Sequence, residues 1–298
     1  MTGRESAATT ERGGTDAVAT GHPATTLRGG VALFALGMVG VLALAVTSVP
    51  ALRTTPGLEA LPFPALVALA AINSTLLLAV FVALGALTAP RVGLRSHVFE
   101  RAARGETDWA AFRESVPTAA AVGAALFVVA TVLDVAFAPF VTVSAPAVGT
   151  DAETLAALAA SIPLRLLYGG VTEELLLRWG VLAPVAWALW RGGTFLGRRS
   201  RSRSQSRSRS RSRRPSAATM WAAVVVSAVL FGAGHLPALA ASFGLTPALI
   251  VRTVVINAVV GVGLGWLFWR RSVETAMVAH ASFHVALLAV STVVVVAT

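Results

Sequence analysis

The 298-residue chain has no cysteine and no lysine, and only one tyrosine. The absence of cysteine excludes disulfides, thiolate metal ligands and a cysteine nucleophile. Any metal would therefore need histidine, aspartate or glutamate ligands. Charged residues make up only 13% of the chain, whereas hydrophobic residues make up 56%. This balance is unusual for a water-soluble domain and predicts a membrane protein.

The formal net charge of +10 first suggests a nucleic-acid partner. Nine of the 24 basic residues lie between Arg198 and Arg214, however, and without them the net charge is +1. This segment alternates arginine with serine, has no apolar face to bury and repels itself, so it predicts a disordered loop. A solvated low-complexity loop is favoured over one that binds RNA or anionic lipid headgroups. A nucleic-acid partner is therefore not expected.

Seven apolar runs are long enough to cross a membrane, which takes about 20 residues of helix. The fourth, at about 33 residues, is too long for one straight span, and Pro163 or the pair Gly169-Gly170 is expected to break it in two. We therefore predict an all-α, polytopic transmembrane bundle with seven to eight membrane-spanning helices. The seven runs cover residues 31–49, 65–87, 118–141, 158–190, 220–240, 247–269 and 275–296.

Basic residues cluster after the second, fourth and sixth spans, whereas the other loops carry Arg53 alone. The positive-inside rule then places the N-terminus and the Arg/Ser loop in the cytoplasm and the C-terminus outside. Residues 1–30 lack an apolar core and are expected to form a disordered cytoplasmic tail, not a cleavable signal peptide. The sequence thus predicts a multi-pass protein of the cell membrane.

Ionisable residues within membrane spans cost about 2.5–3.5 kcal/mol each and are functional hypotheses by default. The fourth span holds Glu173, Glu174 and Arg178 close together. Glu174 and Arg178 are four residues apart in the favourable acid-first order, which predicts an ion pair on one helical face. Glu173 lies about 100° around the helix and has no partner in its own motif. An unpaired carboxylate at low dielectric is suited to act as a general base.

Three histidines in later spans are candidate partners for Glu173. His235 ends an apolar helix, and His280 and His284 lie four residues apart on one helical face. Together they would either bind Zn²⁺ or hold a water molecule and an oxyanion. The predicted span limits conflict with a shared site, because they offset His235 from His280 by about 15 Å along the membrane normal. Tilted or staggered helices would remove this offset.

The remaining membrane charges are interpreted as structural. Asp134 in the third span and Arg165 in the fourth are expected to form an ion pair between these spans. Glu274, Arg270 and Arg271 lie at a predicted cytoplasmic helix end, where charge is expected and no function is assigned.

Three short motifs resemble those of the CAAX prenyl protease and bacteriocin-processing (CPBP) family of intramembrane endopeptidases. The family motif E-E-x-x-x-R matches Glu173, Glu174 and Arg178, and the motif F-x-x-x-H matches Phe231 and His235. The motif H-x-x-x-N matches at His280, but His284 stands where the family has asparagine. The resemblance covers roughly residues 158–284 and leaves the first three spans unassigned.

The resemblance implies a membrane endopeptidase of the glutamate or metallo type that hydrolyses a peptide bond near the membrane. Glu173 would act as general base with His235 as its partner, His280 would be an oxyanion donor, and Arg178 would hold Glu174. His284 would either donate an N–H to the oxyanion or complete a Zn²⁺ site with Glu173, His235 and His280. We further expect an active site that opens toward the cytoplasm. The expected partners are membrane lipids and a peptide or protein substrate, lipidated or not.

Two other functions stay open. Carboxylate–histidine chains also mark proton relays, so a proton-coupled transporter is one alternative. A non-catalytic scaffold or immunity-type membrane protein that keeps the motifs is another. Rival peptidase patterns such as H-E-x-x-H and G-x-S-x-G do not occur.

The sequence also predicts how the chain is organised. A tail, residues 1–30, is expected to precede a membrane domain, residues 31–298. Within this domain, accessory helices (31–141) are expected to precede catalytic helices (158–296), which the loop 191–216 interrupts.

Overall fold

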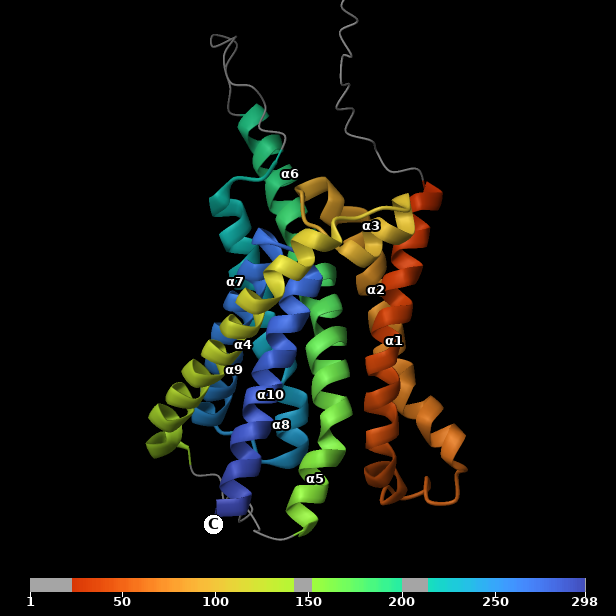
Figure 1. The fold of residues 1–298 in the computed structure, drawn as a ribbon, viewed down its shortest axis with the longest axis vertical. Helices are drawn as coiled ribbons and strands as arrows, with labels where there is room; N and C mark the ends of the chain where they lie inside the picture. Colours follow the sequence, from red (N-terminus) through yellow and green to blue (C-terminus); the bar gives the residue numbers. More distant parts are fainter. Residues whose placement is uncertain (1–22, 142–151, 200–213, 298) are drawn as a thin grey trace, which may run out of the picture.

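The structure is a computed structural model that describes residues 23–141, 152–199 and 214–297. These residues are helical, with no β-strand among them, and they form a bundle of long helices (Figure 1). Seven helices in the described ranges are long and apolar enough to cross a membrane. The predicted fold class, a polytopic helical bundle, is therefore confirmed. The seven candidate spans are Pro23–Arg53, Phe63–Val92, Trp109–Phe140, Ala152–Gly193, Ala217–Ala241, Pro247–Arg270 and Val273–Ala297.

The N-terminal part consists of four α-helices and one 3₁₀ turn. Helices α1 and α2 pack against each other, the short α3 packs across α1, and the long α4 packs against the last helix, α10. Helix α1 begins at Pro23, before the expected end of the tail at residue 30, and residues 1–22 lie outside the described residues. The elements are α1 (Pro23–Arg53), α2 (Phe63–Val92), α3 (His97–Arg104), α4 (Trp109–Phe137) and η1 (Ala138–Phe140).

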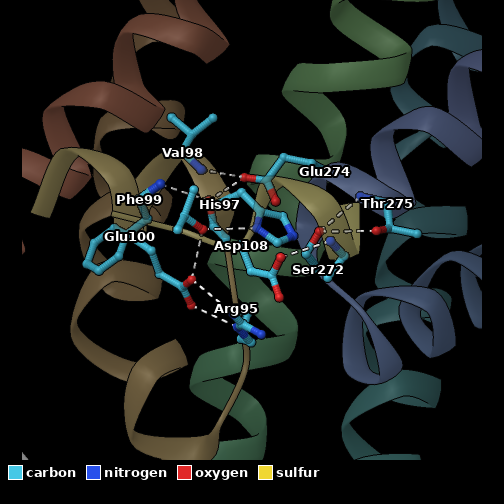
Figure 2. A network of polar contacts seen from close by, with 12 residues as sticks. Arg95, His97, Val98, Phe99, Glu100, Asp108, Ser272, Glu274 and Thr275 are labelled. Atoms are coloured by element: carbon cyan, nitrogen blue, oxygen red, sulfur yellow. Dashed lines mark hydrogen bonds and ion pairs between the residues drawn. The ribbon is translucent and has the colours of Figure 1, made fainter. Parts of the chain in front are cut away.

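Helix α3 is fixed to the bundle by a polar network (Figure 2). Glu274, at the start of α10, accepts hydrogen bonds from Ser96 Oγ (2.5 Å) and from the backbone N–H of Val98 (3.0 Å). Arg95 donates two hydrogen bonds of 2.9 Å to Glu100. Burial raises the pKa of Glu100, but these bonds and the charge of Arg95 outweigh burial and hold it below its ordinary value. Glu274, which the sequence left without a role, thus anchors α3 to α10.

The fourth span is one continuous helical run that changes its winding. After α5 (Ala152–Pro163) the chain continues as two π-helical stretches, η2 (Leu164–Thr172) and η3 (Leu175–Leu182), and then as α6 (Ala183–Arg199). The expected break at Pro163 or Gly169-Gly170 is therefore wrong for the described residues, because the helix widens after Pro163 and does not end there. Wide turns of this kind occur frequently at functional sites, and here they enclose Glu173 and Glu174.

The C-terminal part packs around this run. Helix α7 (Ala217–Gly234) lies against α9 (Pro247–Arg270), with the short α8 (Leu236–Ser242) between them in the chain, and α10 (Val273–Ala297) packs against α4, α9 and η2. Residues 191–199, expected in the Arg/Ser loop, belong to α6, and residues 200–213 lie outside the described part.

Two glycines allow the close helix approaches that position the π-helical run and α10. A Cβ atom at Gly40 of α1 would overlap the Thr172 hydroxyl, which donates a 2.8 Å hydrogen bond to the Gly37 carbonyl. A Cβ atom at Gly123 of α4 would overlap the carbonyl oxygen of Ala279 in α10. Small residues at such contacts are typical of membrane helix packing.

The segments rich in arginine gather at one end of the bundle. The start of α1, the α2–α4 connection with α3, the end of α6 and the α9–α10 turn all lie at the upper end in Figure 1. We call this end the basic end. The start of α5 and the end of α10 lie at the opposite end. This agrees with the loop charges, and the assignment of the basic end to the cytoplasm stays a prediction.

The expected ion pair between Asp134 and Arg165 is wrong. Asp134 pairs with Arg252, because α4 packs against α9 and brings these two side chains together. Arg165 instead donates from Nε to the hydroxyl of Ser161, one turn earlier, over 3.1 Å.

Candidate active site

A cavity of about 290 Å³ brings together four predicted site residues, Glu173, His235, His280 and His284. Their side chains come from three separate elements or junctions: the η2–η3 junction, the end of α7, and α10. Residues of α1 and α9 complete the lining. The three sequence motifs therefore converge on one place.

The second glutamate of the first motif is fully buried and holds two partners. Glu174 Oε1 lies 3.0 Å from Nη1 of Arg178 and 2.9 Å from Nδ1 of His280. The Arg178 guanidinium lies 4.5 Å from the ring centroid of Phe231, close enough for a cation–π contact, and its Nη2 donates to the carbonyl of Gly261 over 3.4 Å. The predicted pair of Glu174 and Arg178 is confirmed. The bond from Glu174 to His280 joins the first motif to the third and was not predicted.

The first glutamate has the opposite environment. Glu173 is half-buried, lines the cavity, and makes no hydrogen bond or ion pair with any residue that the structure describes. The two adjacent carboxylates therefore have different surroundings. Glu174 is held by two partners, whereas the carboxylate of Glu173 can bind a molecule that enters the cavity.

One ring nitrogen of His235, Nε2, is available to accept a hydrogen bond in the cavity. Its Nδ1 lies 2.8 Å from the backbone carbonyl oxygen of Phe231. A carbonyl oxygen only accepts hydrogen bonds, so Nδ1 carries the hydrogen, and in the neutral ring Nε2 has a lone pair.

The expected axial offset does not separate the histidines. The ring of Phe231 has its centroid 4.8 Å from that of His235 and 5.8 Å from that of His280. The helices are staggered, and α7 begins farther out at the basic end than α10 does (Figure 1). A residue late in α7 therefore meets one early in α10.

His284 stacks on His280, with ring centroids 4.9 Å apart and an interplanar angle of 23°. Its Nδ1 is buried and has no hydrogen-bond partner among the residues that the structure describes. A Cβ atom on Gly169 would lie 2.8 Å from Nε2 of His284, so the missing side chain at this position makes room for the imidazole. The histidine that replaces the family asparagine thus fits the site closely.

Two polar residues of the cavity were missed in the sequence. Tyr168, the one tyrosine of the chain, comes from η2, and Asn257 comes from α9, where its Nδ2 donates to the Thr253 carbonyl over 2.8 Å. Both lie inside apolar spans, and a search for uncharged polar residues at membrane depth, in addition to ionisable ones, would have singled them out.

The four residues predicted for Zn²⁺ do not fit a metal site as they are placed here. In the described parts of the chain, no three His, Asp or Glu side chains are close enough together to hold one ion. His280 also uses Nδ1 to bind Glu174. We therefore derive no catalytic step through a metal.

The cavity extends away from the basic end. Leu164, Arg165 and Tyr168 line it and precede Glu173 along the helix, so they lie toward α5. The start of α5 lies at the end of the bundle opposite the basic end (Figure 1). These lining residues thus lie away from the basic end, and the expected opening of the site toward the cytoplasm stays a prediction.

A family model described as type II CAAX prenyl endopeptidase Rce1-like matches residues 155–286. We call residues 155–286 the Rce1-like segment, because this part of the chain is similar to that endopeptidase family. The Rce1-like segment begins in α5, ends in α10, and contains all three motifs. No curated protein and no solved structure matches the chain.

The match to this endopeptidase family and the seven long apolar helices of the described residues together support a multi-pass membrane protein. Helices α1 to α4 precede the matched segment, yet Leu44 of α1 lines the same cavity. The site is therefore built by more of the chain than the Rce1-like segment.

Proposed function

We propose that this protein is an intramembrane endopeptidase in which Glu173 activates a water molecule for attack on a peptide bond. The observation that carries the proposal is the cavity-facing carboxylate of Glu173, without a protein partner in the described chain, surrounded by three histidines. A general base needs this combination of low dielectric, a lone carboxylate and hydrogen-bonding neighbours.

In the proposed reaction, the water oxygen bonds to the carbonyl carbon while Glu173 takes the water proton. The carbonyl π electrons move to oxygen and form a tetrahedral oxyanion. When the C–N bond breaks, the leaving nitrogen takes the proton back from Glu173, so a carboxylic acid and an amine leave the site. His235 accepts a hydrogen bond from the attacking water through Nε2, because its Nδ1–H is held by the Phe231 carbonyl.

His280 is the proposed oxyanion donor. Glu174 accepts from Nδ1, which fixes the ring and leaves Nε2 for the substrate. When Nε2 is protonated, the carboxylate of Glu174 balances the charge of the imidazolium, and the ring donates to the oxyanion. Arg178 and Glu174 are positioning residues in this scheme, since they act through His280 and do not touch the substrate.

The substrate is a peptide or protein whose scissile bond lies at membrane depth. The cavity is at the lower end of the volumes typical of ligand sites, and apolar side chains contribute much of its lining. With the basic end in the cytoplasm, as the positive-inside rule predicts, the cavity faces the outer half of the membrane. Lipidated and unlipidated membrane-anchored peptides are both candidates.

The test uses the purified full-length protein in detergent micelles and in liposomes. Peptides with a membrane anchor and a fluorophore–quencher pair around the membrane-proximal segment are expected to be cut, and mass spectrometry identifies the new termini. The transporter alternative is favoured instead if no peptide is cut and the liposomes show a proton flux. Absence of both activities would favour the scaffold alternative.

Replacing His284 with Asn is expected to keep kcat within about tenfold, because the asparagine amide also supplies an N–H donor. Replacing it with Ala should lower kcat by about 10²–10³, the usual effect of losing one oxyanion donor. Peptide hydrolysis and thermal stability are measured for both variants. If the Asn and Ala variants lose kcat equally and both lose protein-bound zinc, measured by mass spectrometry, the His284 imidazole acts as a metal ligand. That result would contradict its role as an oxyanion donor.

A further inference from the structure

A second cavity, of about 360 Å³, lies at the basic end, between α4, α9 and α10. It is separate from the candidate active site, because the two cavities share no lining residue. Its walls include two arginines at the α9–α10 turn, Arg270 and Arg271, two hydroxyls, Ser115 and Thr275, and one indole, Trp266.

Both arginines are exposed, and no carboxylate of the described residues lines the cavity. Neither guanidinium forms an ion pair in the part of the chain that the structure describes, and the Arg270 guanidinium lies 5.7 Å from the ring centroid of Trp269. The nearest acid along the chain, Glu274, is bonded to Ser96 and Val98 on the side of α3 (Figure 2). Among the described residues, no acidic side chain therefore neutralises the positive charge of this cavity.

The inner wall supplies hydrogen-bonding groups. Ser115 Oγ and Thr275 Oγ1 are buried and lie 2.9 Å apart, and Ser272 Oγ lies 3.2 Å from Thr275 Oγ1. Ser115 donates its hydrogen to the Phe112 carbonyl over 2.7 Å, so the hydroxyl of Thr275 is the one that can turn its hydrogen toward an anion. The outer edge is apolar and includes the exposed indole of Trp266.

We propose that this cavity binds the phosphate of an anionic phospholipid headgroup, with the acyl chains lying along the bundle beside Trp266. Two guanidinium groups and hydroxyls match the charge and the acceptor oxygens of a phosphate. Free inorganic phosphate offers the same chemistry. The phosphate is assigned to a lipid because the cavity lies at the ends of two membrane-spanning helices, α9 and α10. Lipid headgroups lie at this depth, and tryptophan is enriched there. Basic pockets between membrane helices bind such headgroups.

The experiment measures lipid binding by the full-length protein and does not depend on peptidase activity. Native mass spectrometry in detergent counts bound phosphatidylglycerol and phosphatidylcholine, and thermal unfolding is followed as each lipid is added. The test variant is R270Q/R271Q. The control variant is R91Q/R104Q, which removes the same charge from exposed positions outside the cavity.

The wild type and the control are expected to bind phosphatidylglycerol alike and to unfold at a higher temperature with it. The test variant should lose about 100-fold in apparent affinity, at about tenfold for each guanidinium that hydrogen-bonds the phosphate. Equal losses in the two double variants would mean general surface attraction and overturn the proposal. Stabilisation by millimolar inorganic phosphate that matches the effect of the lipid, with no retained lipid, would assign a soluble phosphate ligand and overturn the lipid source.

Discussion

Replacing Glu173 with glutamine is expected to lower kcat for peptide hydrolysis by about 10²–10⁴, the range that a general base contributes. Glutamine keeps the size of the side chain but cannot take the proton of the attacking water. The thermal stability should stay close to that of the wild type, because Glu173 makes no hydrogen bond or ion pair with the described residues. Substrate binding should change little, so the loss should appear in kcat more than in KM.

The matched control is E153Q, which makes the same change on an exposed position of α5, outside the cavity. It should retain wild-type kcat and stability. An E173Q variant that cleaves as fast as E153Q would contradict the role of Glu173 as the base. If the wild type cleaves no peptide but Glu173 proves necessary for proton flux, the same pair of variants supports the transporter alternative.

Replacing Arg178 with methionine is expected to lower the free energy of unfolding by about 3–5 kcal/mol, the usual cost of removing one partner of a buried ion pair. The reason is that the Glu174 carboxylate, with no exposed surface, would lose the charge 3.0 Å away and keep only His280. The contact of Arg178 with the Phe231 ring would also be lost. Unfolding of the purified protein in mixed micelles measures the change.

The control for this prediction is R104M, at an exposed arginine of α3, which should change stability by less than about 0.5 kcal/mol. The double variant E174Q/R178M tests the cause, because it removes both charges. It should be less destabilised than the sum of E174Q and R178M. Strict additivity, or an R178M variant as stable as R104M, would mean that the pair carries no such energy.

The local part of the site could be predicted from the sequence. Glu174 and Arg178 are four residues apart, and this spacing brings them onto one face of a helix regardless of what surrounds it. The same spacing rule left Glu173 without a partner, as observed. The bond between Glu174 and His280 spans 106 positions in the chain and depends on how α10 is rotated against the π-helical run. The hydrophobic periodicity of a single helix does not predict how that helix is rotated against its neighbour.

Two expectations about the helices failed for tertiary reasons. Asp134 pairs with Arg252 and not with Arg165, because α9 and not the fourth span packs against that part of α4. Pro163 was expected to interrupt the fourth span, since proline lacks the N–H that a helix uses. The chain instead continues in wider turns after it, which the neighbouring helices support. The apparent depth difference between His235 and His280 had a similar origin, because span limits alone do not show stagger.

The anchoring of α3 to α10 limits how the protein can be divided into fragments. Glu274 lies inside the Rce1-like segment, but both of its hydrogen-bond donors, Ser96 and Val98, lie outside (Figure 2). The indole N–H of Trp179 likewise donates to the Val82 carbonyl over 3.3 Å. A fragment cut at the family boundary would leave the Glu274 carboxylate and the Trp179 indole N–H without these partners. The boundary of sequence similarity is thus not a suitable place to truncate the protein. Transplanting the three motifs into another scaffold would require the first four helices as well.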